Sequence, residues 1–275
     1  MKKITFLIIL SVLFILERTY AQPTISAATN NPTVGEMFTQ YQIGYEDPGA
    51  SGANITWDFS GIISLQTLTN TFMLPSATPY ASTFLNANLA SSVTSSSSTY
   101  YYYFIANSTN YSIAGIDIPA SSATMPYSDP ENMLQYTMTY NTSYTDNFAC
   151  TVSGYDRHGN VSVVADAYGT LNMPYGSVTN VLRLKFSETY ADYMSGTAIT
   201  NYTSTNYYWY KPGVHNCILQ LSTLNVNGSV YQQYGMYIDC SNIGINKNTD
   251  KQNDIICYPI PAKENLTIET NSDTE

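Results

Sequence analysis

The stretch Val181-Leu182-Arg183-Leu184-Lys185-Phe186 is the clearest indication of how this chain folds. Leu182, Leu184 and Phe186 alternate with the charged residues Arg183 and Lys185. In an extended strand, successive side chains point to opposite faces, so this order separates an apolar face from a charged one. We therefore expect a strand that buries one face and exposes the other to solvent.

The same strand character extends over most of the chain. Between positions 22 and 242 the sequence is rich in Tyr, Thr, Ser, Asn, Val and Ile, which is typical of strands and turns rather than helices. The polar run Asn107-Ser108-Thr109-Asn110 predicts the turn of a hairpin formed by Thr99–Ala106 and Tyr111–Asp117. Further strands are expected at Phe38–Tyr45, Ile55–Phe59, Ser64–Met73, Tyr144–Tyr155, Val161–Ala167, Thr203–Tyr210, Cys217–Leu224 and Val230–Asp239.

Helical signals are weak throughout. The Ser- and Ala-rich stretch Pro75–Ser98 predicts a loop that contains a short helix around Ala81–Ala90. No stretch carries a long, clean repeat of 3.6 residues. These observations predict an all-β fold with an antiparallel sheet, built as a sandwich or as a curved, partly open barrel with long polar loops.

Composition excludes several classes of protein. The 275 residues include 10 Lys+Arg and 20 Asp+Glu, which gives a formal net charge of −10, and 44% of them are hydrophobic. This apolar content is too high for a disordered chain. The acidic balance offers no basic surface for nucleic acid, so no nucleic-acid partner is expected.

The first 21 residues have the pattern of an export signal. Lys2 and Lys3 precede the apolar run Ile4–Ile15, and small residues follow, so cleavage is expected between Ala21 and Gln22. A membrane span needs about 20 apolar residues, more than this run supplies. We expect an exported protein with residues 22–242 as its β domain and no membrane span once the signal is removed.

A second compositional change follows this domain. Residues 243–254 are polar and predict a linker, and residues 255–275 carry Tyr258, Pro259, Pro261, Ala262, Leu266 and Ile268 in an alternating context. This pattern resembles the start of the type A C-terminal sorting domain of cargo proteins of the Bacteroidota type IX secretion system, with Ile260 in place of the usual Asn. The resemblance implies the type IX machinery as a partner and a secreted or cell-surface location. Members of that family continue for several more strands, so an incomplete sorting domain would imply a periplasmic location instead.

The body also resembles uncharacterised secreted β domains of such cargo. The likeness rests on residues 52–60, on the order of residues from Tyr168 to Arg183, and on Tyr208-Trp209-Tyr210-Lys211-Pro212-Gly213. It implies a curved, partly open barrel and no particular activity. Gly169 and Gly176 are expected to bracket a tight connection between two strands, and Pro212-Gly213 a turn.

Residues suited to catalysis or metal binding are sparse. The two histidines, His158 in a predicted polar turn and His215, lack the neighbouring ligands of a zinc site, so no metal and no cofactor is expected. Asp129 and Glu131 are the nearest candidates for a glycosidase pair, and Asp129-Pro130-Glu131-Asn132 for a calcium loop. The alternative interpretation is an acidic surface loop.

The row Tyr100-Tyr101-Tyr102-Tyr103 allows two interpretations as well. Exposed rings would form a platform on which sugar rings or another flat ligand stack. The alternative is an ordinary strand, in which consecutive tyrosines place two rings on each face.

The cysteines offer a test of strand register, since an exported chain passes through an oxidising compartment. The four are Cys150, Cys217, Cys240 and Cys257. If Gly228-Ser229 is a two-residue turn, Cys217 lies opposite Cys240 and a disulfide between them is expected. The rival turn, Asn227-Gly228, places these two cysteines diagonally.

Two functions follow from these observations. The first is a secreted or cell-surface binding or structural protein without catalysis, in contact with a glycan or another surface polymer. The second is a secreted hydrolase, a glycosidase or peptidase, acting on extracellular polymers. The scarcity of histidine and the absence of a nucleophile motif favour the first.

Overall fold

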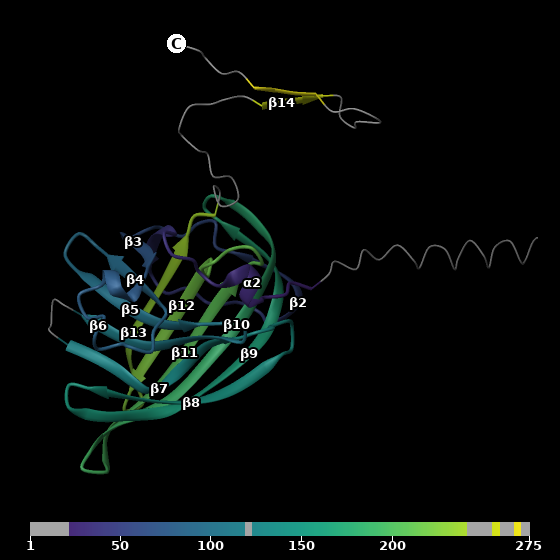
Figure 1. Cartoon of the computed structure of the whole chain (residues 1–275). Helices are drawn as coiled ribbons and strands as arrows, with labels where there is room; N and C mark the ends of the chain where they lie inside the picture. Colours follow the sequence, from purple (N-terminus) through teal and green to yellow (C-terminus); the bar gives the residue numbers. More distant parts are fainter. Residues whose placement is uncertain (1–21, 119–122, 241–254, 259–266, 271–275) are drawn as a thin grey trace, which may run out of the picture. The chain divides into compact units, whose positions relative to one another are not determined.

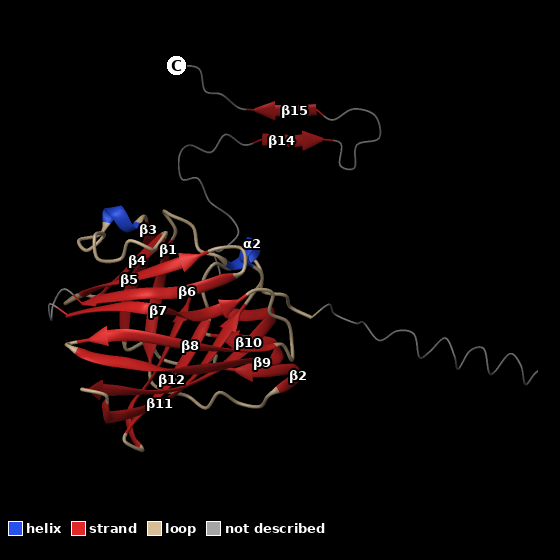
Figure 2. Cartoon of the chain, turned by 60° about the horizontal axis from the view of Figure 1, so that its bottom comes forward, coloured by secondary structure: helices blue, strands red, loops and turns tan. Residues whose placement is uncertain are grey.

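The computed structural model describes residues 22–118, 123–240, 255–258 and 267–270 (Figure 1). Its Cα positions divide the chain into two units, Met1–Ser241 and Asn242–Glu275. The first is an all-β, mainly antiparallel body, which confirms the predicted class (Figure 2). Its elements are α2 (Ala27–Asn30), β1 (Met37–Ile43), β2 (Gly52–Asp58), β3 (Gln66–Met73), η1 (Pro75–Ala77), β4 (Leu89–Thr94), β5 (Thr99–Ala106), β6 (Asn110–Ile118), β7 (Ala123–Gln135), β8 (Ser143–Val152), β9 (Tyr155–Met173), β10 (Gly176–Met194), β11 (Thr197–Tyr210), β12 (Leu219–Val226) and β13 (Ser229–Ile238).

The strands of the body close into a ring. Among the described residues, twelve strands pair in the order β10-β11-β12-β13-β1-β3-β4-β5-β6-β7-β8-β9, and β9 pairs in turn with β10. The fold is therefore a closed barrel, where the sequence predicted a sandwich or a partly open barrel. Closure leaves no free sheet edge in the ring, and strand residues alternate between its interior and exterior.

Strand β2 is additional to this ring and runs parallel to β9. Residues 155–164 of β9 pair with β8, whereas residues 167–172 pair with β2 along the same edge. The long strand β9 thus has two successive partners on one side and β10 on the other. This arrangement places β2 beside the wall of the barrel without making it part of the closed circuit.

The interior of the barrel is filled by two apolar clusters. Leu182, Leu184 and Phe186 of β10 are at most 1% exposed and share a cluster with Leu134 of β7 and Val163 of β9. Strands β7 and β10 are not neighbours in the sheet, so these side chains meet inside the ring. The second cluster contains Phe72, Leu89, Phe104 and Ile113 from β3 to β6. The apolar face predicted for residues 181–186 is confirmed.

The opposite face of β10 is buried at Arg183 and half-buried at Lys185, contrary to the prediction of a solvent-exposed face. Arg183 is only 1% exposed, and Val181 belongs to a core outside the ring that includes Trp57, Phe59 and Trp209. The cover is the segment around β2, whose aromatic rings pack on the outer face of the wall. Alternation along one strand indicates that its two faces differ chemically. It does not indicate whether another segment of the chain covers the charged face.

Other local predictions were wrong. Residues 81–90 form turns followed by the start of β4, not a helix, and Phe84 in these turns is buried and stacks on Tyr103 with ring centroids 3.9 Å apart. Strand β4 was expected to be loop because it is rich in Ser and Ala. Strand β7 was missed because it contains Pro126 and Pro130, which lie where its pairing with β6 and β8 is irregular.

The second unit is described over two short strands. β14 (Ile255–Tyr258) and β15 (Thr267–Thr270) pair antiparallel in a sheet of their own, with Cys257 opposite Ile268. The predicted linker at 243–254 lies outside the described residues. In the described part of the chain, no helix has both the length and the apolar character needed to cross a bilayer.

Candidate functional site

Two β-bulges lie on opposite sides of β9, one in its pairing with β2 and one in its pairing with β10. Pairing of β2 with β9 shifts register between Gly52 and Ile55, and pairing of β10 with β9 shifts between Val178 and Val181. Within these bulges Asn54 and Asn180 adopt positive φ angles of 56° and 61°. The other four non-glycine residues with positive φ in the described chain lie in turns between strands. Bulges of this kind often stand beside functional sites.

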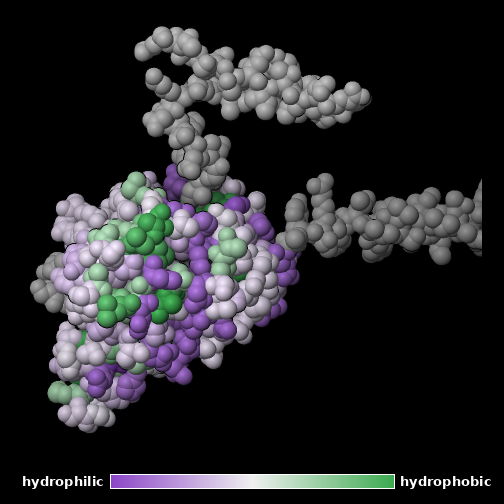
Figure 3. All heavy atoms as spheres, in the orientation of Figure 1, coloured by the Kyte–Doolittle hydropathy of each residue, from purple (hydrophilic) through white to green (hydrophobic). Residues whose placement is uncertain are grey.

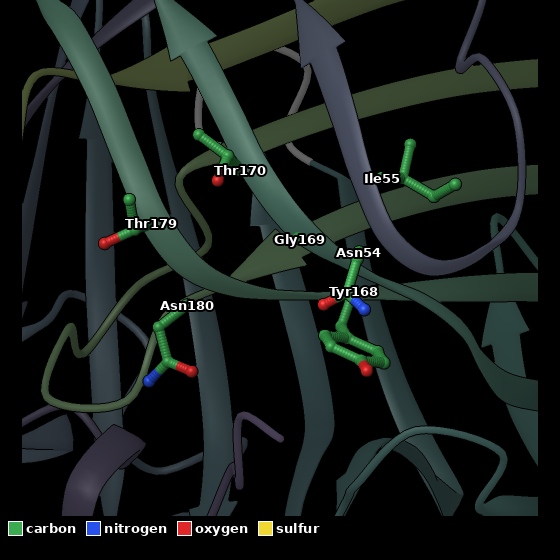
Figure 4. A pocket seen from close by; sticks show the side chains of 7 residues that line it. All are labelled: Asn54, Ile55, Tyr168, Gly169, Thr170, Thr179 and Asn180. Atoms are coloured by element: carbon green, nitrogen blue, oxygen red, sulfur yellow. The ribbon is translucent and has the colours of Figure 1, made fainter. Parts of the chain in front are cut away.

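The bulges line an open cavity of about 520 Å³, which is within the range of roughly 300–1,000 Å³ typical of small-ligand sites. Its lining is Asn54, Ile55, Tyr168, Gly169, Thr170, Thr179 and Asn180. Figure 4 shows that Tyr168 and Asn180 project to one side of the strands, whereas Ile55 projects away from them. We call this the bulge cavity. It presents amides, hydroxyls and one aromatic ring, and no acidic or basic side chain.

Gly169 allows β2 to approach closely enough to form one side of the cavity. A Cβ atom at this position would lie 1.8 Å from the carbonyl oxygen of Ile55, which is its partner in the parallel pairing. No side chain fits in that space, so glycine is required by the approach of the neighbouring backbone. The sequence predicted that Gly169 and Gly176 bracket a connection. The turn lies at residues 174–175, and Gly169 is inside β9.

A buried arginine holds the segment before β2 in place. Arg183 donates from Nε and Nη2 to the two carboxylate oxygens of Asp166 at 2.8 and 2.9 Å, and from Nη1 to the carbonyl oxygens of Pro48 and Gly49. Its guanidinium also lies over the rings of Trp57, Tyr207 and Trp209. These contacts fix the segment that precedes β2, and so fix one wall of the bulge cavity.

A groove of about 460 Å³ lies on the other side of β2 and shares Ile55 with the bulge cavity. It is lined in part by the carboxylates of Glu46, Asp47 and Asp58. Asp47 accepts a hydrogen bond from the backbone of Gly49, and Asp58 from the backbone and hydroxyl of Ser60. The Ser60 contacts lower the pKa of Asp58. Two of the three carboxylates therefore stabilise their own turns.

The tyrosine row does not form an exposed platform. Tyr100, Tyr101 and Tyr102 are half-buried in β5, and Tyr103 is fully buried and shares a hydrogen bond of 2.7 Å with Thr78. Tyr102 packs with the inner cluster and Tyr101 with the outer cluster of Tyr103. The structure agrees with the interpretation as an ordinary strand that has rings on both faces.

The predicted acidic loop is part of strand β7. Asp129 is exposed, whereas Glu131 is 5% exposed and faces the barrel interior, so the two carboxylates do not converge. Glu131 instead neighbours Glu188 of β10. No group of three or more His, Cys, Asp or Glu side chains in the described residues is arranged to hold a metal ion, which leaves the suggested calcium loop without support.

The histidines lie apart from the cavity. His158 is exposed in β9, stacked on Tyr193 with centroids 4.1 Å apart, and not in the predicted turn. His215 Nδ1 lies 2.6 Å from Glu36 Oε1. The predicted turn at Pro212-Gly213 is present.

The cysteines are free where the structure describes their side chains, namely Cys150, Cys217 and Cys240. The hairpin turn is Asn227-Gly228, since Val226 pairs with Ser229. Cys217 packs with the inner cluster and Cys240 with the outer one. The expected register and disulfide were therefore wrong: the turn differs from the expected one, and a bulge between Leu224 and Asn225 then shifts the pairing by a single residue, which sends the two side chains to opposite faces of the sheet.

Two predicted segments have little or no description. Residues 1–21, which include Ala21, lie outside the described residues, and Gln22 is exposed. Of the sorting motif, Pro259, Pro261, Ala262 and Leu266 lie outside them, while Tyr258 is in β14 and Ile268 in β15. The export predictions remain predictions.

Sequence reasoning did not find the bulge cavity. Its polar residues are common strand and turn residues, and Asn54 and Asn180 are 126 positions apart in the chain. The available signals were an Asn directly before each of two predicted strands, at positions 54 and 180, and Gly169, since both residue types tolerate unusual backbone geometry. Comparison with protein-family models, with curated proteins and with solved structures gave no match.

Proposed function

We propose that this chain is a secreted or cell-surface binding protein without catalysis, and that the bulge cavity holds an uncharged polar ligand such as a saccharide unit of an extracellular polymer. Export through the type IX secretion system is part of this proposal and rests on the sequence patterns at the two ends. The observation that carries the binding proposal is the cavity itself. It combines a ligand-sized volume with a lining of amides, hydroxyls and an aromatic ring.

The chemistry of the lining favours a saccharide over a charged ligand. The amides of Asn54 and Asn180 and the hydroxyls of Thr170 and Thr179 supply both donors and acceptors, as sugar hydroxyls require. Tyr168 offers a ring with a polar tip, suited to a surface that is apolar and wet at once. A phosphate or carboxylate ligand is favoured by a basic side chain, and the lining contains none.

The alternative function, a secreted hydrolase, would need a nucleophile or an acid–base pair at the ligand. The seven lining residues include no carboxylate, histidine, cysteine or serine. The carboxylates of the neighbouring groove are engaged in local turns at Asp47 and Asp58. A binding role is therefore the better match to this site.

Titration of the purified chain with a panel of soluble oligosaccharides tests the proposal. We expect saturable binding, weakened by about fivefold in Asn54→Gly and in Asn180→Gly, because each substitution removes one hydrogen-bonding amide worth about 1 kcal/mol. Glycine accepts the positive φ of both positions, so the backbone is preserved.

Asn227→Gly is the matched control, since Asn227 also has positive φ but lies in the β12–β13 turn and not in the cavity lining. This variant should bind as the unmodified chain does. Absence of saturable binding across the panel, or equal affinity in all three variants, would contradict the proposal. Cleavage of a bound oligosaccharide, followed by chromatography, would replace it with the hydrolase alternative.

A further inference from the structure

Two carboxyl groups meet inside the barrel, away from the bulge cavity. Glu131 of β7 and Glu188 of β10 lie within hydrogen-bonding reach of each other, although their strands are not neighbours in the sheet. Glu131 is 5% exposed, and its Oε1 is buried with no hydrogen-bond partner among the described residues. A buried charge without a partner is costly, so the state of this pair needs an explanation.

The groups around the pair do not supply a counter-charge. The titratable and charged side chains that face it are Tyr127 of β7, Tyr144, Asp146 and Cys150 of β8, Arg157 of β9, Tyr190 of β10, Tyr208 of β11 and Tyr234 of β13. Arg157 is the cation of this set, and it binds Asp192 through Nε at 2.6 Å and Nη2 at 2.9 Å. Its charge is therefore matched elsewhere.

The neutral contacts of the pair agree with one protonated carboxyl. Tyr127 donates a hydrogen bond of 3.4 Å to Glu131 Oε2, and the amide of Asn206 donates one of 3.3 Å to Glu188 Oε2. Each carboxyl thus has one donor at one oxygen. A proton on Glu131 would turn the contact between two acceptors into an O–H···O hydrogen bond.

We propose that Glu131 and Glu188 share one proton at neutral pH and that this proton joins β7 to β10 across the barrel interior. The geometry gives the contact a structural role, because β7 has few pairing partners on its other side. In the described residues its register with β8 is limited to Tyr127 with Cys150 and Asp129 with Ala149. Loss of the shared proton would leave two carboxylates facing each other, Glu131 buried and Glu188 half-buried, beside this weakly paired part of the sheet.

Burial and the neighbouring Glu188 both raise the pKa of Glu131 above its ordinary value of 4.5. A group whose pKa is raised by folding contributes stability that is complete below its unfolded pKa and is lost as the pH rises toward the folded value. The barrel should therefore become easier to unfold as the pH increases above about 4.5, through neutrality.

The experiment measures protonation and unfolding in the purified chain and in Glu131→Gln, whose neutral amide replaces the protonated acid. Infrared spectroscopy should show the carbonyl stretch of a protonated carboxylic acid at pH 7 in the unmodified chain and not in Glu131→Gln. The unfolding equilibrium constants should be similar near pH 4. At higher pH, the unfolding equilibrium constant of the unmodified chain should rise relative to that constant in Glu131→Gln, by roughly tenfold per pH unit.

Asp129→Asn is the control, because Asp129 is an exposed carboxylate two positions away on the same strand. It should keep both the infrared signal and the pH dependence. No protonated carboxyl at pH 7 in the unmodified chain, or a signal that persists in Glu131→Gln, would overturn the proposal. If Glu131→Gln does not fold, the infrared spectrum of the unmodified chain decides the question, with Glu188→Gln expected to perturb the signal and Asp129→Asn to leave it unchanged.

Discussion

Arg183 on the outer face of the wall and Glu131 on its inner face are both almost inaccessible to solvent, yet they are accommodated in different ways. Arg183 has a bidentate carboxylate, two backbone carbonyls and three aromatic rings around its guanidinium. Glu131 has one weak donor at Oε2, an unpartnered Oε1 and a second carboxyl beside it. One group keeps its charge because its partners are in place, and the other lacks such partners.

This difference shows how the barrel uses its two faces. The outer face of β10 is covered at Arg183 by the segment around β2, and Arg183 attaches that segment through backbone carbonyls of Pro48 and Gly49. The inner face is shared by strands from all around the ring, so its polar groups come from positions far apart in sequence. A buried arginine cannot lose its proton, whereas a buried carboxyl can gain one. The two sites should therefore respond oppositely to substitution.

The largest expected effect is that of Arg183→Met. Removing the guanidinium leaves Asp166 without its ion-pair partner and releases the segment before β2, so the free energy of unfolding should fall by about 3–5 kcal/mol. Urea denaturation at pH 7 measures the change. Lys185→Met is the control, since Lys185 is half-buried on the same strand and should change stability by less than about 1 kcal/mol. If the two substitutions lowered the free energy of unfolding equally, the contacts of Arg183 would contribute no more to stability than those of Lys185, which would contradict this prediction.

A smaller effect is expected from Gly169→Ala, which disturbs the same outer layer without touching a charge. The new Cβ would meet the backbone of Ile55 at 1.8 Å, so β2 must shift, at a cost of about 1–3 kcal/mol. Saccharide binding at the bulge cavity should weaken together with stability. Gly61→Ala provides the control, because a Cβ there meets nothing within 4 Å. Unchanged stability in Gly169→Ala would contradict the close approach of β2 to β9.

The smallest effect should come from Asp192→Asn, which breaks the other arginine pair. Burial raises the pKa of Asp192, but the hydrogen bonds from Arg157 and Tyr202 outweigh burial and lower it below its ordinary value of 3.8. The stability that this pair contributes is present above pH 3.8 and is lost as the pH falls through the lowered pKa.

We therefore expect Asp192→Asn to lower the thermal midpoint at pH 7, and the gap to the unmodified chain to narrow below about pH 4. Its effect should be smaller than that of Arg183→Met, because the Arg157 side chain is 17% exposed and that of Arg183 only 2%. The stability contributed by Asp192 is lost as the pH falls, whereas the stability contributed by protonated Glu131 is lost as the pH rises. A gap of constant size from pH 7 to pH 3 would show that Asp192 does not titrate with folding.

Many of the strands could be predicted because their signal is local. Thr99–Ala106 was predicted with the bounds that β5 has, and the alternation in residues 181–186 identified the inward face of β10. Strands β4 and β7 were not predicted, because small residues in β4 and prolines in β7 interrupt the alternation of apolar and polar side chains. The candidate site could not be found in the same way. Its residues come from β2, β9 and β10, and the cavity exists only where two bulges flank one strand.

The sequence by itself determined that the chain is a β protein, because alternation of side chains and turn chemistry act over a few residues. The tertiary structure decided which faces are buried and by what. Ring closure, the parallel position of β2, the burial of Arg183 and the meeting of Glu131 with Glu188 all join residues that are distant in the chain. Cys217 and Cys240 show the same limit, since a one-residue bulge between Leu224 and Asn225 put the two on opposite faces of the sheet. Periodicity records which side chains share a face, but only packing determines what that face meets.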